Sequence, residues 1–171
     1  MKKLIILLTT IISFGISESL SQTFQFENYE WGISKDEAIK QVMENGYTIL
    51  DTGSHKKDGG EGLMYEDSVF HSKIRVFLTF SPITKKLCSI MILSDDPLVG
   101  DKLKPILSKK YGNPNQNKDS MHSYDWKQNG QLRLGLYYNF NTMIIYYPAE
   151  YYSIYEKEEE KLNKIEVENK F

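Results

Sequence analysis

The sequence predicts an α+β fold in which two helix-plus-three-strand antiparallel meander repeats form a two-layer helix/sheet sandwich. Two amphipathic helical patterns, near residues 34–45 and 97–110, are each followed by three short stretches with the character of strands. The same order of elements therefore occurs twice. The chain has 171 residues, which is enough for one domain with its own hydrophobic core.

The N-terminus has the features of a secretory signal peptide. Two lysines precede an apolar run from Leu4 to Ile12, and a short serine-rich segment follows. We expect cleavage between Ser21 and Gln22, which makes residues 1–21 the signal peptide and the mature protein periplasmic or secreted. The alternative is an uncleaved membrane anchor, which needs roughly 18 apolar residues. The run is shorter than that, so we expect no transmembrane segment after cleavage.

Charge and cysteine content narrow the class of protein. Residues 22–171 contain 19 basic and 22 acidic residues, a net charge of about −3. Nucleic acids and anionic membranes bind basic surfaces, so we expect no nucleic-acid partner. A single cysteine, Cys88, cannot form an internal disulfide. It lies in an apolar stretch that predicts a strand, which favours a buried thiol over a reactive one.

In the first half, Ser34-x-x-Glu37 has the form of a capping box, in which the hydroxyl and the carboxylate each accept a hydrogen bond from a backbone N–H at a helix start. Gly46 is typical of a helix end. A short strand is expected before this helix, at residues 24–29. Residues 51–62 contain four glycines and no apolar residue, which predicts a surface loop, and their spacing matches neither common phosphate-binding motif. Three strands follow, near residues 63–70, 73–80 and 86–93. The middle one alternates, with Ile74, Val76, Leu78 and Phe80 on one face and Lys73, Arg75, Phe77 and Thr79 on the other.

The second half begins with a helix over residues 97–110, with Asp96 as its cap and Pro97 at its first position. Pro105 lies inside this helix and is expected to kink it or to split it in two. The apolar stripe that should face the core consists of Val99, Leu103, Ile106, Leu107 and Tyr111. Three further strands are expected near residues 121–127, 131–138 and 143–147.

Asn129-Gly130 predicts a hairpin for which two registers compete. A two-residue turn places Trp126 opposite Arg133 and brings charged side chains onto the face of the leucines. A three-residue loop with a bulge gathers the apolar side chains on one face, so we expect this form, with Trp126 in the core. Its pairs are Trp126 with Leu132, Tyr124 with Leu134, His122 with Leu136 and Asp125 with Arg133.

The C-terminal segment, residues 156–171, carries six glutamates and four lysines. It predicts an exposed helix or a frayed tail, stabilised by side-chain pairs such as Glu160 with Lys164. A helix that docks a partner is the alternative. The expected organisation is a signal peptide, a single α+β domain over residues 22–155, and this charged tail.

Two short motifs mark the repeats. Trp31-Gly32-x-Ser34 opens the first repeat, and Tyr111-Gly112-x-Pro114 closes the helix of the second. With these motifs the chain resembles poorly characterised exported bacterial proteins that share a Trp-Gly-x-Ser start and a Tyr-Gly-x-Pro middle. Its layout is similar to the tandem helix-plus-sheet repeats of beta-lactamase-inhibitor-protein-like proteins. The resemblance covers residues 24–148 and implies a non-catalytic protein that binds another protein through an open sheet face or its loops.

No pattern of catalytic or metal-binding residues stands out in the sequence. The histidines His55, His71 and His122 are isolated, and metal sites need clustered ligands. No serine or cysteine lies in a recognisable nucleophile motif. The acidic pairs Glu66-Asp67 and Asp95-Asp96 are expected to be turn and cap residues. We therefore expect no enzyme, no metal and no cofactor, although paired carboxylates that meet only in the folded chain stay an open alternative.

The positive signal is tyrosine, of which the chain has twelve. Alternation along a strand turns one ring of each pair inward and the other outward, and exposed tyrosines suit protein interfaces. Tyrosines also line ordinary amphipathic sheets. The pairs are Tyr137-Tyr138, Tyr146-Tyr147 and Tyr151-Tyr152.

From these observations we expect an exported binding, inhibitory or assembly protein of the cell envelope that docks a protein partner. The expected binding residues lie on the open sheet face and are Arg75, Phe77, Arg133 and Tyr137. The alternative is an envelope hydrolase or glycan-binding protein that uses the 51–62 loop and the exposed tyrosines.

Overall fold

The computed structural model of the chain describes residues 26, 29–53, 61–116, 122–128 and 131–168. The expected signal peptide, residues 1–21, lies outside the described residues, as do most of the glycine-rich loop and the Asn129-Gly130 turn. Of the strand expected at residues 24–29, only Phe26 and Tyr29 are described, and neither belongs to a strand.

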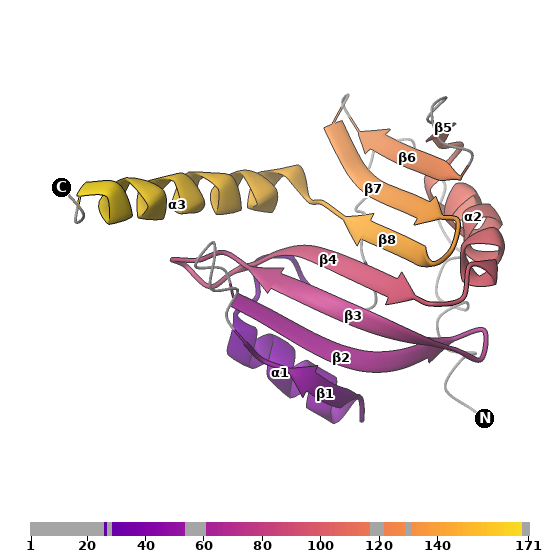
Figure 1. Cartoon of the computed structure of the whole chain (residues 1–171), viewed down its shortest axis with the longest axis horizontal. Coiled ribbons are helices and arrows are strands. Elements are labelled where there is room, and N and C mark those ends of the chain that lie inside the picture. The colour runs from indigo at the N-terminus through magenta and orange to yellow at the C-terminus, as the bar shows by residue number, and fades with distance from the viewer. Residues whose placement is uncertain (1–25, 27–28, 54–60, 117–121, 129–130, 169–171) are drawn as a thin grey trace, which may run out of the picture.

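Within these ranges the fold is α+β, with three helices and one eight-stranded antiparallel sheet (Figure 1). The strand order in the sheet is β1-β2-β3-β4-β8-β7-β6-β5. The elements are α1 (Lys35–Glu44), β1 (Thr48–Asp51), β2 (Glu61–Val69), β3 (Ser72–Phe80), β4 (Leu87–Ser94), α2 (Leu98–Tyr111), β5 (Asn115–Gln116), β6 (Ser123–Gln128), β7 (Gln131–Tyr138), β8 (Thr142–Tyr146) and α3 (Ala149–Glu168).

Six of the seven predicted strands are confirmed to within two residues at each described end, and two short strands were missed. β1 has four residues with a bulge, and of these only Ile49 packs against the core, so no alternating pattern reveals it. β5 consists of Asn115 and Gln116, which have low strand propensity. Both lie at the edges of the sheet.

The predicted capping box starts α1. The Ser34 backbone N–H donates to the Glu37 carboxylate at 2.8 Å, and the Glu37 N–H donates to the Ser34 hydroxyl at 3.3 Å. The bond from the Ser34 backbone, followed by the one from its side chain, lowers the pKa of Glu37. The helix ends before Gly46, whose φ of +74° favours glycine.

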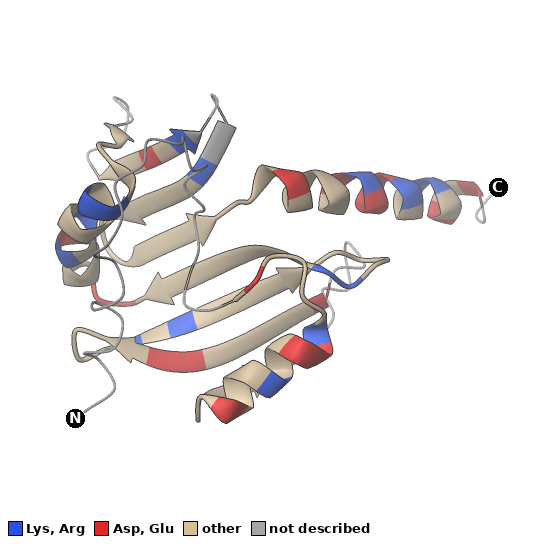
Figure 2. Cartoon of the chain, turned by 180° about the vertical axis from the view of Figure 1, so that it is seen from behind, with Lys and Arg blue, Asp and Glu red and all other residues tan. Residues whose placement is uncertain are grey.

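α1 and α2 both lie on the same face of the sheet, the one turned to the viewer in Figure 2. Between them and the sheet is the hydrophobic core. The alternating residues of β3 point into it as predicted, and Trp126 is 2% exposed and donates its indole N–H to the Gly112 carbonyl at 2.7 Å. The core includes Ala38, Val42, Val76, Leu78, Phe80, Ile90, Ile92, Leu107, Tyr111, Trp126, Leu134, Leu136 and Ile144.

α2 corrects three expectations. It is one continuous helix, so Pro105 does not split it. Proline has no N–H to donate to the Asp101 carbonyl, but both residues are exposed, so this carbonyl is open to water. Ile106 is 49% exposed and points away from the core. The helix begins at Leu98, so Pro97 is the residue directly before it and not its first position; the Asp96 carboxylate accepts a hydrogen bond from the Leu98 N–H at 3.0 Å.

The hairpin of β6 and β7 has its bulge in β7 and not in the turn. Lys127 pairs with Leu132, as in the two-residue register, but Trp126 pairs with Leu134, so Arg133 is the extra residue. The four predicted pairs are therefore wrong. The face is still right, because a shift of two residues returns every side chain to the same side. The observed pairs include Trp126 with Leu134, Tyr124 with Leu136, Asp125 with Gly135 and Ser123 with Tyr137.

α3 begins seven residues before the predicted start and contains none of the buried residues. It leaves the end of β8 between the diverging ends of β4 and β7, and its C-terminal half projects from the body (Figure 1). The ring of Tyr151 packs directly on Gly32. The predicted pair of Lys164 with Glu160 is present at 2.8 Å. Among the described helices, none combines the length and apolar character needed to cross a bilayer.

Gly32→Ala and Gly46→Ala form a matched pair, because both glycines have a positive φ, of +82° and +74°. An added Cβ collides with the Tyr151 ring at Gly32, whereas Gly46 has nothing within 4 Å. We expect Gly46→Ala to lower the free energy of unfolding by about 1 kcal/mol. Gly32→Ala should cost about 1–3 kcal/mol more, measured by urea unfolding. Equal losses at both positions would show that Tyr151 does not depend on Gly32 for space.

Candidate protein-binding face

The face of the sheet opposite α1 and α2 is covered by none of the described helices (Figure 1). We name it the open face. Solvent-facing sides of antiparallel sheets are ordinarily polar. Here seven side chains on five of the strands are apolar or aromatic and partly exposed: Met64, Phe77, Met91, Leu93, Tyr137, Met143 and Ile145.

Strand register arranges these side chains in two rows that cross the sheet. Neighbouring strands are about 4.8 Å apart, so each row of five positions is about 19 Å long. The first row runs through Met64, Phe77, Met91, Ile145 and Gly135. The second row runs through Glu66, Arg75, Leu93, Met143 and Tyr137.

Phe77 and Arg75 lie on β3, as expected, and both side chains belong to the open face. Phe77 is half-buried between Met64 and Met91. Arg75 forms an ion pair with Asp95 at 2.9 Å, in which the two side chains are 45% and 88% exposed. An exposed pair of this kind contributes little to stability, so Arg75 can exchange Asp95 for another partner at small cost.

Tyr137 lies flat along β7 over Gly135. A Cβ on Gly135 would collide with this ring, and the Tyr137 hydroxyl donates to the Asp125 carboxylate at 3.2 Å. Burial, followed by the charge of Asp125, raises the pKa of Tyr137 to about 12. The phenol is therefore neutral at physiological pH, and its ring presents an apolar surface to solvent.

Arg133 is placed differently from the other three expected residues. It is the bulged residue of β7, where its carbonyl accepts a hydrogen bond from the Tyr147 N–H at 2.8 Å. Its Nε and Nη1 atoms are buried. The structure therefore brings Arg75, Phe77 and Tyr137 into the two rows and leaves Arg133 outside them.

Five apolar members of the rows were not predicted: Met64, Met91, Leu93, Met143 and Ile145. A signal for them exists in the sequence. β4 reads Leu-Cys-Ser-Ile-Met-Ile-Leu-Ser and β8 reads Thr-Met-Ile-Ile-Tyr, so both strands are apolar on both faces. Such a run is typical of a strand that is covered on both sides.

The tyrosine pairs alternate as predicted. Tyr138 and Tyr146 are buried, and their partners Tyr137 and Tyr147 are half-buried. The rings of Tyr147 and Tyr152 meet edge to face at 5.2 Å, and Tyr155 stacks on Tyr152 at 6.2 Å, which links β8 to the first turns of α3.

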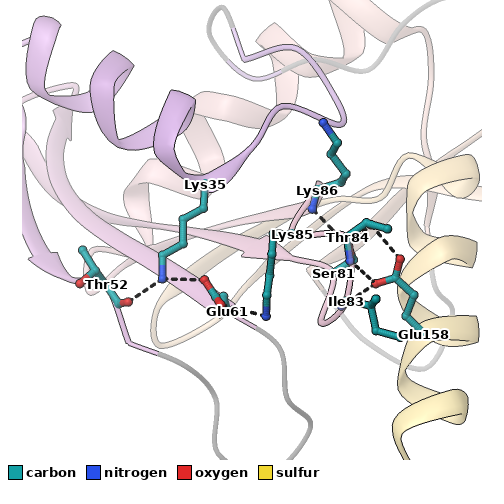
Figure 3. A network of polar contacts seen from close by, with 9 residues as sticks. All are labelled: Lys35, Thr52, Glu61, Ser81, Ile83, Thr84, Lys85, Lys86 and Glu158. Atoms are coloured by element: carbon teal, nitrogen blue, oxygen red, sulfur yellow. Dashed lines mark hydrogen bonds and ion pairs between the residues drawn. The ribbon is translucent and has the colours of Figure 1, made fainter.

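Two carboxylates hold loops beside α1 and α3 (Figure 3). One is Glu61, at the end of the 51–62 loop, and the other is Glu158 of α3, which binds the turn between β3 and β4. Glu61 pairs with Lys35 at 3.0 Å and with Lys85 at 2.8 Å. Glu158 of α3 accepts hydrogen bonds from the backbone N–H groups of Ile83 and Thr84, at 2.8 and 3.1 Å, and from the Thr84 hydroxyl. These carboxylates are saturated by protein donors, so the network is a structural clamp.

Of the histidines and acidic residues that the sequence analysis considered for metal binding or catalysis, most of those described have structural roles. Asp96 caps α2, Asp95 pairs with Arg75, and the His122 ring stacks on Tyr138 at 4.7 Å. No group of three or more histidine, cysteine or acidic side chains suited to a metal occurs among the described residues. A cavity of about 70 Å³ at the base of the 51–62 loop is much smaller than the roughly 300–1,000 Å³ of ligand pockets.

Cys88 should be almost inert in the folded protein. It is buried at the bulge of β4, its thiol donates to the Thr79 carbonyl at 3.2 Å, and burial raises its pKa to about 12. At pH 8 we expect a thiol-specific disulfide reagent to label it at least about 100-fold more slowly than an exposed thiol. The variant Cys88→Ser with Ser89→Cys moves the thiol to the half-exposed neighbour and should react rapidly. Similar rates would contradict burial of Cys88.

The Glu61 clamp should make stability depend on pH. Hydrogen bonds from Lys85 and then Lys35 lower the pKa of Glu61, so its contribution is present above the ordinary carboxyl pKa and is lost as the pH falls through the lowered value. We expect Glu61→Gln to cost roughly 0.5–1 kcal/mol at pH 7, because the side chain is partly exposed. The difference from the parent in urea unfolding should shrink as the pH falls below the ordinary carboxyl pKa. The exposed pair of Lys40 with Glu44 provides the control, since Glu44→Gln should cost less.

Comparison of the chain with protein-family models, with curated proteins and with solved structures found no match.

Proposed function

We propose that this chain is an exported, non-enzymatic binding, inhibitory or assembly protein of the cell envelope, which docks a protein partner through the open face. The observation that carries the proposal is the partly exposed apolar surface across β2, β3, β4, β8 and β7. Contiguous apolar patches on a protein surface mark sites of interaction. Export rests on the signal-peptide pattern of residues 1–21.

The composition of the open face suits a protein partner. Phe77 and Tyr137 supply large, rigid rings of the kind that dominate binding energy when a partner buries them. Three methionines, Met64, Met91 and Met143, lie in the same rows and adapt easily to the shape of a partner. Glu66 of β2 and Lys73 and Arg75 of β3 are charged and lie at one end of the rows, where they supply a polar rim, as in other interfaces.

We also infer that the two halves of the chain are helix-plus-three-strand repeats that together form a two-layer helix/sheet sandwich, which would place the open face across the junction of the repeats. The midpoint of the β4–β8 ladder is the pair of Ile92 with Ile144. A two-fold axis through this pair relates the two rows to each other. It makes Phe77 equivalent to Tyr137, Met91 to Met143, and Leu93 to Ile145.

The hydrolase or glycan-binding alternative receives less support. It depends on the 51–62 loop, of which residues 54–60 lie outside the described chain. The cavity at the base of this loop is smaller than a ligand pocket. Asp51, which lines it, accepts a hydrogen bond from the Gly53 N–H, and Glu61 beside it is held by two lysines. The sheet face therefore carries the proposal.

Site-specific photocrosslinking in the cells that export the protein tests the proposal. A photoreactive residue at position 91, in the centre of the open face, should yield a crosslinked protein that is absent when the residue is at position 43 of α1. Met43 is 65% exposed and lies on the other side of the sheet. Adding Phe77→Ala and Tyr137→Ala should reduce the crosslink at least about tenfold, since hot-spot truncation typically costs 2 kcal/mol or more.

Two results decide against this function. The first is the same set of crosslinked proteins from positions 91 and 43, and the second is no change on truncating both rings. Thermal unfolding of each variant shows whether it is folded, so a loss of crosslinking can be assigned to the open face.

A further inference from the structure

The projecting half of α3 carries an apolar stripe, Leu162 and Ile165, that does not pack on the core of the described chain. Nearer the body, the same side of the helix packs through Tyr151 on Gly32 and through Glu158 on the β3–β4 turn. Leu162 and Ile165 continue this side at spacings of four and three residues, where the helix has passed the body (Figure 1). Ile165 is 43% exposed.

One border of this stripe is acidic, whereas the other carries Lys161. α3 contains seven glutamates and three lysines. Glu159 and Glu166 are seven residues apart and follow one flank of the stripe, and Glu159 makes no ion pair with any described residue. The projecting half of α3 is therefore an apolar strip with an acidic border.

The outward side of α2 has the opposite character. Leu98 and Ile106 are 58% and 49% exposed there, with Pro105 exposed between them. Lys102 and Lys109 lie on the same side, and neither makes an ion pair within the described chain. α2 as a whole contains four lysines and one aspartate.

α2 and the tip of α3 lie at opposite ends of the molecule along its longest axis (Figure 2). They cannot meet within one chain. A second copy placed end to end brings the acidic strip of one molecule to the basic, apolar side of α2 on the next.

We propose that the protein associates head to tail with a second copy of itself, through the acidic projecting half of α3 and the basic outward side of α2. Contact would bury Ile165 and Leu162 against Leu98 and Ile106, and the acidic border formed by Glu159 and Glu166 would lie along the lysines of α2. The two surfaces differ, so the contact is heterologous and each added copy leaves one of each surface free. A single helix-to-helix contact is small, so the association is weak and depends on concentration.

Sedimentation velocity of the purified exported chain, with its N-terminus established by intact-mass spectrometry, tests the proposal. Between about 10 µM and about 500 µM the weight-average mass should rise by at least half, as expected for a small interface. At about 0.5 M NaCl it should return to that of the monomer, because salt screens exposed charges.

Charge reversal identifies the two surfaces. The α2 variant, Lys102→Glu with Lys109→Glu, and the α3 variant, Glu159→Lys with Glu166→Lys, should each be monomeric at every concentration. An equal mixture of the two should regain the association of the parent chain. Lys40→Glu on the exposed surface of α1 is the control and should associate like the parent.

Three results would overturn the proposal: a monomer at every concentration of the parent chain, an α2 variant that still associates, or a mixture that stays monomeric. Persistent association of the α2 variant would instead indicate contact between two α3 helices. All of these measurements are independent of what the open face binds.

Discussion

The ladder between β4 and β8 positions all three helices. At one end of it, the buried Thr142 hydroxyl donates to the Asp96 carbonyl at 3.0 Å and accepts from the Gly100 N–H at 2.9 Å, which holds the start of α2. At the other end β8 stops before β4 does. There the Leu87 carbonyl accepts a hydrogen bond from the Gly32 N–H at 3.1 Å, and the Leu87 N–H donates to the Ile33 carbonyl at 2.9 Å, just before α1 begins. α3 departs at the same end.

The same ladder explains why the apolar surface is a face and not an edge. β4 and β8 are the central strands, and their outward residues fall in the middle of both rows. Exposed edges of sheets invite strand-to-strand aggregation, and here they are short: β1 has four residues with a bulge and β5 has two polar residues. The surface left for binding is therefore made of side chains.

Local signals predicted the fold well where a single element contains its own information. The capping box of Ser34 and Glu37, the β3 alternation and the glycine at position 46 act over a few residues, and all three are confirmed. The hairpin register failed because a bulge at Arg133 and a bulge in the turn gather the same side chains on one face, and only the surrounding sheet decides between them. The placement of Ile106 was wrong because the side of α2 that packs on the sheet runs through Val99, Leu107 and Tyr111, and Ile106 lies beside it.

The candidate site was predictable in part for the same reason. Arg75, Phe77 and Tyr137 were identified from alternation along single strands, whereas the rows join residues from five strands whose order depends on the β4–β8 pairing. That pairing links residues about 50 positions apart, and no local pattern encodes it. The continuous apolar runs of β4 and β8 were the available signal, and they predict strands covered on both sides. The described chain covers only one of those sides.

The open face and the two helical ends use different directions of the molecule, so they do not compete. The sheet presents its face across the longest axis, while α2 and the tip of α3 lie at the ends of that axis (Figures 1 and 2). In a head-to-tail chain of copies, every molecule therefore keeps its open face available. Several weak faces held on one assembly bind a repeated or clustered partner with an effective concentration that a single copy cannot reach. Weak contacts between copies and weak contacts at each open face would then be sufficient for strong attachment to the partner. A monomer, which has a single open face, would lack this gain.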